Sequence, residues 1–376
     1  MSSDVEMSAY LHEFEPRDWT VAQLGLRVTA SQGRPEYGLR YDVPPAPAPL
    51  LTTWLTADGQ RFRRDAFAGG MTIKDLDFTE TYALALRNVR DQSVEFVPHR
   101  QFPAGFQVKV ASGQVASLLA APDVLAEADV PGELLVVAPT GDDLALVGSE
   151  EPQLALAYGY ALIESVKAGP RGLSPMIYRV VDGSRLEPWI PEAGSPLRPL
   201  YERARQVELE RRYGPMLQYE KIGHYTLQGQ AFEDSRTEAA PPRWAYDAEA
   251  NRLVSYCVWQ PSRYPGLIPP VDWVAVNVRT SRSAPQAWIP VAKLAEIAGV
   301  EVAETTEFGL PLTVVNWPGG SEGGADPEVL LKPVKAAGGR TAAQLRVPKE
   351  PAHILDWMPA GSRFTRVDEF PELLLP

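Results

Sequence analysis

The sequence predicts an α+β protein in which a central α/β module is flanked by β-rich sections at both ends. Three observations support this prediction: short apolar runs bounded by turn residues, amphipathic helical segments in the middle of the chain, and aromatic strand-like runs in the last third. The chain has 376 residues, more than a single hydrophobic core usually accommodates. We therefore expect a β-rich N-terminal section over 1–70, the central module over 71–230, and a β-rich C-terminal domain over 243–376 with a Gly-rich loop and a tail.

The N-terminal section is expected to contain two β-hairpins. In the first, the apolar run 24–29 pairs with 37–41 across a turn that contains glycine and proline. The second joins 50–56 to 60–64 through an Asp-Gly dipeptide, which is typical of tight hairpin turns.

The central module opens with a predicted helix near 76–90. Asp75, Asp77 and Glu80 supply the negative charge that suits a helix N-terminus, and apolar residues recur at helical spacing behind them. Three further elements are expected before Pro131: a strand over 106–110 and helical segments over 114–121 and 124–128.

The stretch from Pro131 to Trp189 has the most regular pattern of the chain. Two apolar runs, 133–138 and 144–147, flank a turn and predict a pair of strands. The elements expected after them are an amphipathic helix over 153–167, a strand over 176–181, and a charged helix over 197–213.

The residues of this stretch also carry a family resemblance. The apolar run 132–137, the acidic turn Gly141-Asp142-Asp143 and the run 173–178 follow one another as strand, turn and closing strand. Over about 71–189 the chain resembles the YtpQ-like family of conserved bacterial proteins of unknown function. The resemblance implies no active-site residues, so none are assigned from it.

Beyond a predicted linker near 230–243 the composition becomes aromatic and strand-like. The strands expected there are 252–260, 273–280, 286–289 and 312–317, with a short helix over 291–298. A Gly-rich loop over 318–325 and a tail over 350–376 follow.

The charge of the chain argues against general nucleic-acid binding. The formal net charge is -12, whereas sequence-independent affinity for DNA depends on clustered basic side chains. Arg61, Arg63 and Arg64 form one local basic candidate. A second group of arginines is accompanied by acids and is expected to form a solvated helix face: Arg203, Arg205, Arg211 and Arg212.

Other bulk features predict a soluble cytoplasmic protein. The single cysteine, Cys257, excludes an intrachain disulfide and lies in a strand-like run, which indicates a buried and unreactive thiol. The acidic N-terminus is unlike a secretory signal, and no apolar run reaches the length of about 18 residues that suggests a membrane span.

One motif suggests catalysis. Asp75-Leu76-Asp77-Phe78-Thr79 fits the D-x-D-x-T pattern of haloacid-dehalogenase-type phosphatases. In such an enzyme Asp75 would attack phosphorus, Asp77 would act as acid and base, and Mg²⁺ would neutralise the phosphate. The competing interpretation is an acidic helix start.

Two further candidates come from single residues. Gly319-Gly320-Ser321-Glu322-Gly323 satisfies the G-x-S-x-G pattern with His353 downstream, but it lies in a Gly-rich loop instead of a strand-to-helix turn. His224, beside Tyr225 and Lys221, is a candidate acid or base, against the interpretation of a surface histidine.

The functional hypothesis is a non-catalytic binding or scaffold protein that uses no cofactor and binds a protein partner or itself. Tryptophans of the C-terminal part are its binding candidates, because aromatic residues are enriched at the energetic centres of interfaces. These are Trp244, Trp259, Trp273 and Trp288. The alternative is a Mg²⁺-dependent phosphoester hydrolase that uses Asp75 and Asp77.

Overall fold

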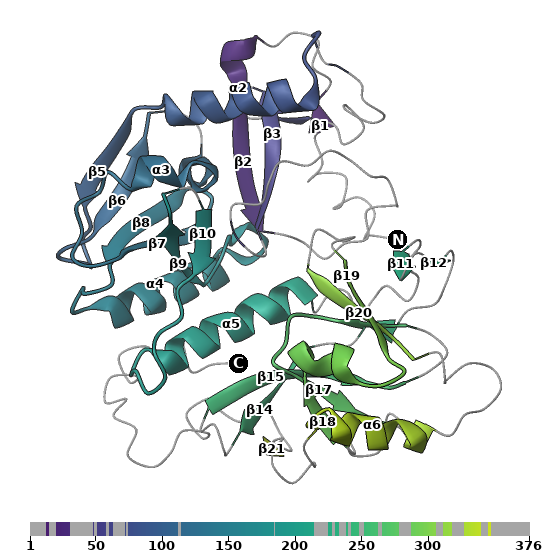
Figure 1. Cartoon of the computed structure of the whole chain (residues 1–376). Helices are drawn as coiled ribbons and strands as arrows, with labels where there is room; N and C mark the ends of the chain where they lie inside the picture. Colours follow the sequence, from purple (N-terminus) through teal and green to yellow (C-terminus); the bar gives the residue numbers. More distant parts are fainter. Residues whose placement is uncertain are drawn as a thin grey trace, which may run out of the picture. The chain divides into compact units, whose positions relative to one another are not determined.

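The structure of the chain is a computed structural model (Figure 1). It describes residues 13–14, 20–30, 48, 51–57, 60–62, 72, 74–111, 114–183, 185–213, 225–227, 230–232, 238–239, 242–247, 252–261, 265–277, 287–305, 311–317, 327–339 and 345–346. The helices and antiparallel sheets confirm the α+β class.

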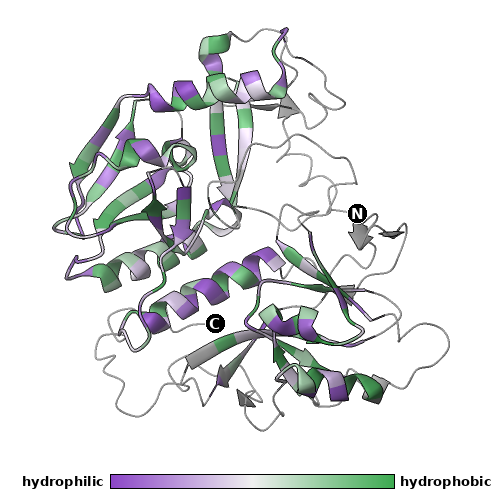
Figure 2. Cartoon of the chain, viewed as in Figure 1, coloured by the Kyte–Doolittle hydropathy of each residue, from purple (hydrophilic) through white to green (hydrophobic). Residues whose placement is uncertain are grey.

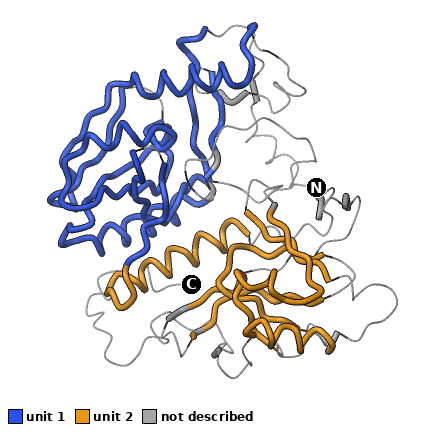
Figure 3. The backbone as a smooth tube through the Cα atoms, in the orientation of Figure 1, with its two compact units in different colours: residues 1–31, 39–191 blue, residues 32–38, 192–376 orange. Residues whose placement is uncertain are grey.

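The chain divides into two compact units (Figure 3). The first comprises Met1–Ser31 and Leu39–Pro191, and the second comprises Gln32–Gly38 and Glu192–Pro376. The division therefore differs from the three predicted sections 1–70, 71–230 and 243–376. The main break falls after Pro191, because the helix that ends the predicted central module packs on the sheet of the second unit.

The first unit begins with a four-stranded sheet in the order β1-β4-β3-β2. Its strands are β1 (Glu13–Phe14), β2 (Leu24–Ala30), β3 (Leu51–Ala57) and β4 (Gln60–Phe62). The predicted second hairpin is confirmed, since Thr56 pairs with Arg61. The predicted first hairpin stays a prediction, because residues 37–41 lie outside the described part. The described partner of β2 is β3, which pairs with it along its whole length, from Leu24 with Ala57 to Ala30 with Leu51.

Helix α2 (Phe78–Arg90) packs against β2. Alternate residues of β2 are buried, as expected of a strand with one covered face. The side chain of Asn88 on α2 donates hydrogen bonds to the carbonyls of Val21 and Leu24, at 3.0 and 2.9 Å. These bonds join the helix to the start of the strand.

A six-stranded antiparallel sheet forms the larger part of the first unit, in the order β10-β9-β7-β8-β6-β5. Its strands are β5 (Val94–Pro98), β6 (Phe106–Val110), β7 (Leu134–Thr140), β8 (Asp143–Gly148), β9 (Ile177–Val181) and β10 (Arg185–Pro188). The sequence patterns predicted β6 to β9 but not the edge strands β5 and β10. Edge strands are half solvated, so their apolar pattern is weak.

Three helical segments pack beside this sheet. Helix α4 (Leu154–Lys167) packs on β7 and β8, and the 3-10 segment η3 (Val115–Ala120) contacts β2, β6 and β8. The short helix α3 (Pro122–Leu125) follows η3 directly. The two helical segments predicted over 114–128 are therefore a 3-10 turn and a single α-turn.

Strands β7 and β8 form the core of the first unit. Their central residues have 0% exposure: Leu135, Val136, Val137, Ala138, Leu144, Ala145, Leu146 and Val147. At the end of β8, Gly148 lies so close to Pro131 that an added Cβ atom would come within 1.9 Å of the Pro131 carbonyl oxygen. Only glycine fits there, since the clashing atom is backbone.

We expect Gly148→Ala to lower the free energy of unfolding of the first unit by about 3 kcal/mol or more, because overpacking against backbone has no flexible group to yield. The matched control is Gly141→Ala at the other end of β8, where an added Cβ atom would lie 3.5 Å from the side chain of Gln114. That change should stay within about 0.5 kcal/mol. Urea unfolding followed by hydrogen exchange in β7 and β8 measures both, and equal effects would contradict the prediction.

The second unit contains two larger sheets. The five-stranded sheet has the order β18-β17-β15-β14-β21, and the four-stranded sheet has the order β13-β16-β20-β19. The strands of the first are β14 (Arg243–Asp247), β15 (Arg252–Trp259), β17 (Trp273–Val276), β18 (Ala287–Pro290) and β21 (Leu345–Arg346). Those of the second are β13 (Glu238–Ala239), β16 (Gly266–Ile268), β19 (Glu301–Thr305) and β20 (Leu312–Asn316).

Smaller elements complete this unit. The pair β11 (Tyr225–Leu227) and β12 (Gln230–Phe232) is antiparallel. The 3-10 segment η6 (Val291–Glu296) replaces the predicted helix over 291–298, and α6 (Leu331–Ala336) packs near β18.

The five-stranded sheet is buried on both faces. Cys257, Val274 and Ile289 belong to one apolar cluster, while Tyr256 and Ala275 belong to another. Because neighbouring residues of a strand point to opposite faces, the two clusters lie on opposite sides of the sheet.

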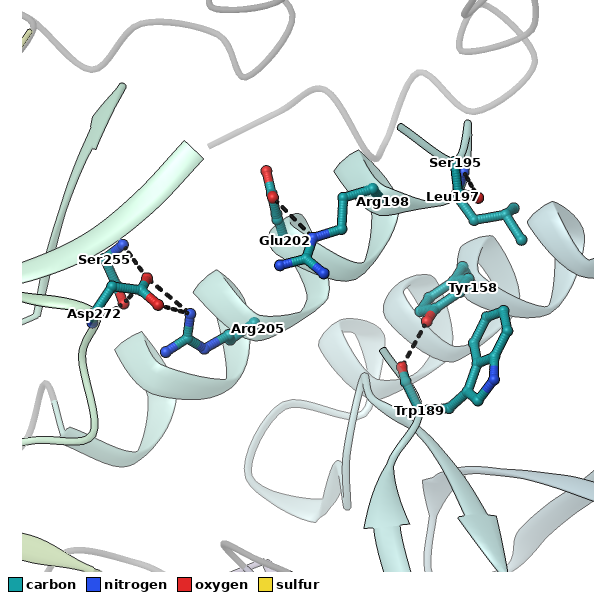
Figure 4. A network of polar contacts seen from close by, with 9 residues as sticks. All are labelled: Tyr158, Trp189, Ser195, Leu197, Arg198, Glu202, Arg205, Ser255 and Asp272. Atoms are coloured by element: carbon teal, nitrogen blue, oxygen red, sulfur yellow. Dashed lines mark hydrogen bonds and ion pairs between the residues drawn. The ribbon is translucent and has the colours of Figure 1, made fainter. Parts of the chain in front are cut away.

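Helix α5 (Arg198–Tyr213) packs against β15 although hydrophilic residues run along much of its length (Figure 2). Arg205 on α5 donates to both carboxylate oxygens of Asp272, at 3.0 and 2.8 Å, and to the carbonyl of Pro270 (Figure 4). The amide and hydroxyl of Ser255 also donate to Asp272, each at 2.8 Å. These bonds satisfy the polar groups that the helix places against the sheet.

The expectation of a solvated face for the arginines of this helix is therefore corrected. Arg212 is 4% exposed and pairs with Glu208, which is 2% exposed, at 3.1 Å. Arg203, Arg205 and Arg211 are half-buried. Glu208 is the buried partner of Arg212, one helical turn away, whereas Arg205 pairs with Asp272 outside the helix and Arg203 donates to Gln206.

Candidate functional site

The first unit brings together a histidine, an aspartate and a tyrosine from three separate elements. His99 follows β5, Asp143 begins β8, and Tyr160 lies in the second turn of α4. All three side chains are half-buried. We call these residues the His-Asp-Tyr cluster.

Tyr160 and Asp143 are joined by a short hydrogen bond, in which the phenol donates to Oδ2 of the carboxylate. Burial raises the pKa of Tyr160 well above its ordinary value, and the hydrogen bond and negative charge of Asp143 act in the same direction. Glu164, one turn along α4, adds to this effect. Tyr160 is therefore a protonated donor at physiological pH, not a base.

The loop that carries His99 is fixed by several contacts. The ring of His99 stacks on Phe102 with centroids 4.0 Å apart, and Tyr160 meets both rings edge-on, at 5.5 and 5.8 Å. Phe102 is fully buried, and the amide of Ala104 donates to the buried carboxylate of Glu151 at 3.1 Å. This packing holds His99 beside Tyr160.

The hydrogen bonding of His99 selects one tautomer. The amide of Gln101 donates to Nδ1 at 3.1 Å, so Nδ1 must be unprotonated and the neutral ring carries its proton on Nε2. Burial lowers the pKa of His99, and the charge of Asp143 opposes this only in part. The ring is therefore neutral near pH 7.

One atom of the cluster has no partner. Oδ1 of Asp143 is buried and accepts no hydrogen bond, and Asp143 forms no ion pair with a described basic side chain. A buried acceptor of this kind costs about 1–3 kcal/mol. The arrangement thus offers a carboxylate oxygen to any donor that reaches it.

The titration of His99 should appear in the pH dependence of stability. Its pKa is lower in the folded than in the unfolded chain, where it is about 6.5. The unfolded chain therefore binds more protons as the pH falls below about 6.5, and stability is lost through that window. We expect the unfolding free energy of the wild type to fall from pH 7 to pH 5 more steeply than that of His99→Phe, which keeps the ring packing. Parallel urea curves at both pH values would exclude this role.

The structure places the phosphatase candidates Asp75 and Asp77 at the start of α2. Asp77 is the N-cap: its Oδ1 accepts from the amide of Glu80 at 2.8 Å, and Glu80 returns a bond to the amide of Asp77 at 3.0 Å. Asp75 is exposed in a turn with a left-handed φ of 65°. This geometry is that of a capping box. It agrees with the interpretation of these residues as an acidic helix start.

Two substitutions of Asp77 distinguish a role as helix cap from a role in catalysis. We expect Asp77→Ala to destabilise the first unit by about 1 kcal/mol, whereas Asp77→Asn keeps a capping oxygen and should change little. Asp75→Asn is the matched control, because asparagine also tolerates the left-handed conformation. Urea unfolding measures stability, and hydrolysis of p-nitrophenyl phosphate with Mg²⁺ measures catalysis. Turnover by the wild type that Asp77→Asn abolishes would contradict a purely structural role.

The candidate tryptophans lie in the second unit and are mostly buried. Trp259, Trp273 and Trp288 are 3%, 6% and 1% exposed, and Trp244 is half-buried. Trp273 and Trp288 belong to the cluster on one face of the five-stranded sheet, and Trp259 belongs to the cluster on the other. They pack as core residues and do not form one surface.

The remaining candidate residues either lie outside the described part of the chain or are buried. His224, Arg63, Arg64, the 319–323 motif and His353 lie outside the described residues, as does the side chain of Arg61. Cys257 is fully buried, and burial raises the pKa of its thiol well above the ordinary value. The prediction of a buried thiol is confirmed.

Sequence reasoning did not single out His99, Asp143 or Tyr160 as site residues. Asp143 was identified only as part of a turn, and Tyr160 only as an apolar position of a helix. The available signal was weak: a polar residue at the first position of a buried strand and a tyrosine on the apolar side of an amphipathic helix.

Comparisons of the chain with family models, with curated proteins and with solved structures gave no match. The resemblance to the YtpQ-like family accordingly stays a hypothesis. Within the part of the chain that the structure describes, no helix is long and apolar enough to cross a membrane. Among the same residues, no group of three or more His, Cys, Asp or Glu side chains could hold a metal ion.

Proposed function

We propose that this chain is a non-catalytic binding protein whose first unit holds a small ligand at the His-Asp-Tyr cluster. The observation that carries the proposal is Oδ1 of Asp143, a buried carboxylate oxygen without a hydrogen-bond partner. A ligand that donates a hydrogen bond would satisfy this oxygen, which belongs to a half-buried side chain.

The placement of the catalytic candidates supports binding over hydrolysis. Asp77 is engaged as the cap of α2, and the thiol of Cys257 is buried. Tyr160 is held protonated and donates to Asp143, while the unprotonated nitrogen of neutral His99, Nδ1, already accepts from the amide of Gln101. The hydrolase alternative through Asp75, Asp77 and Mg²⁺ has no observation of its own in its favour.

A protein partner or self-association belongs to the same proposal, as does the cytoplasmic location that the sequence predicts. Multi-angle light scattering on the full chain tests self-association, since a monomer has a mass of 41.3 kDa. The ligand site is tested separately.

The test of the ligand site is a screen of the full chain against a library of small polar fragments by saturation-transfer NMR. We expect fragments whose signals disappear with Asp143→Asn but persist with Asp142→Asn. Asp142 is the matched control because it is the neighbouring carboxylate and is exposed. A library without binders, or binders indifferent to Asp143→Asn, would overturn the proposal.

A further inference from the structure

The charge around the His-Asp-Tyr cluster identifies the chemical class of its ligand. A carboxylate that is removed from water is normally paired with a cation or held by hydrogen bonds. Two basic side chains of this unit pair with other acids: Lys167 pairs with Glu164, and Arg179 pairs with Glu133 and Glu187. Asp143 has no such partner.

The cluster supplies no positive charge of its own. His99 is the one titratable base in it, and burial lowers its pKa, so the ring is neutral near pH 7. Asp143 and Glu164 both raise the pKa of Tyr160, which reports a negative potential at the phenol. Asp142 lies beside Asp143 and is exposed. A cation is therefore attracted to this point of the unit, in a chain whose formal net charge is -12.

The hydrogen bonding adds a second requirement. Tyr160 already donates to Oδ2, so the vacant acceptor is Oδ1. An N–H group on a cation gives the strongest bond to a carboxylate oxygen, because both partners are charged.

We infer that the His-Asp-Tyr cluster binds an organic cation with an N–H donor, a primary ammonium or guanidinium group, through Asp143. The inference rests on the proposed function and names its ligand class. The half-buried rings of His99 and Tyr160 lie beside this carboxylate.

The test separates charge from hydrogen-bond donation. The full ¹⁵N-labelled chain is titrated with methylammonium, with acetamide, which donates without charge, and with tetramethylammonium, which is charged without a donor. We expect saturable shifts of the Asp143 and Tyr160 amides with methylammonium, and affinities at least about tenfold weaker for the other two probes. Acetamide binding as tightly as methylammonium would overturn the inference.

Substitutions test whether methylammonium binding depends on the carboxylate of Asp143. Asp143→Asn should weaken methylammonium binding by about tenfold or more, whereas Asp142→Asn should leave it within about twofold. Tyr160→Phe is the second variant, in case Asp143→Asn perturbs folding; it frees Oδ2 and should retain cation binding. Loss of binding in Asp142→Asn equal to that in Asp143→Asn would reduce the site to a diffuse acidic surface and overturn the inference.

Primary ammonium groups are carried both by small metabolite amines and by basic side chains of peptides. A second binding experiment distinguishes these two sources. n-Butylammonium is compared with the peptide acetyl-Gly-Lys-Gly-amide under the same conditions. Tighter binding of the peptide assigns a protein partner, and tighter binding of the free amine assigns a metabolite.

The two proposals fail differently. Fragment binders that depend on Asp143 but no methylammonium binding would overturn the cation class and leave the ligand site standing. The absence of both kinds of binder would overturn the site itself.

Discussion

The pairing of β7 with β8 is the interaction on which the first unit depends. Four other elements are positioned by it: β9 pairs with β7, β6 pairs with β8, and α4 and η3 pack on the pair. The fit of Gly148 against Pro131 fixes the end of the hairpin, and Asp143 is the first residue of β8. The His-Asp-Tyr cluster is therefore attached to the buried β7–β8 hairpin, and a rigid support of this kind suits a site that must keep its geometry.

The second unit is built on a different principle. Its five-stranded sheet is apolar on both faces, yet the helix that packs against it is largely charged. The charges are tolerated because they are paired. Asp272 accepts from Arg205 and Ser255, and Glu208 is buried against Arg212 (Figure 4 shows the Asp272 contacts). Burial raises the pKa of Glu208 while Arg212 opposes the shift, which is the balance expected of a desolvated ion pair.

Much of the fold could be predicted because several elements carry a strong local signal. Helices α2, α4 and α5 have helical spacing and clear ends, and β7 and β8 are apolar runs around a turn. The elements that were missed are short or lie at sheet edges, such as β5, β10 and β16, where few residues are available to show a period. The partner of β2 was also missed, since strand pairing across a long connection leaves no local trace.

The His-Asp-Tyr cluster could not be predicted from the sequence for the same reason. His99, Asp143 and Tyr160 are distant in sequence, and only the packing of α4 on β8 and of the β5–β6 loop beside it brings them together. Asp77 shows the opposite case, in which a local motif suggested chemistry and the local helix geometry explained it. The five-stranded sheet has an apolar cluster on each face, and tryptophans of the second unit pack in both clusters.

The charged surface of α5 also bears on how the chain is made. Proteins fold from the N-terminus during synthesis, and α5 precedes every strand of the sheet on which it packs. A helix with an apolar face would have to wait at the ribosome with that face exposed to other nascent chains. Because α5 is rich in Arg and Glu, most of its surface can stay in water until β15 and β17 are complete, and only a few apolar side chains, such as Leu209, are exposed before it docks.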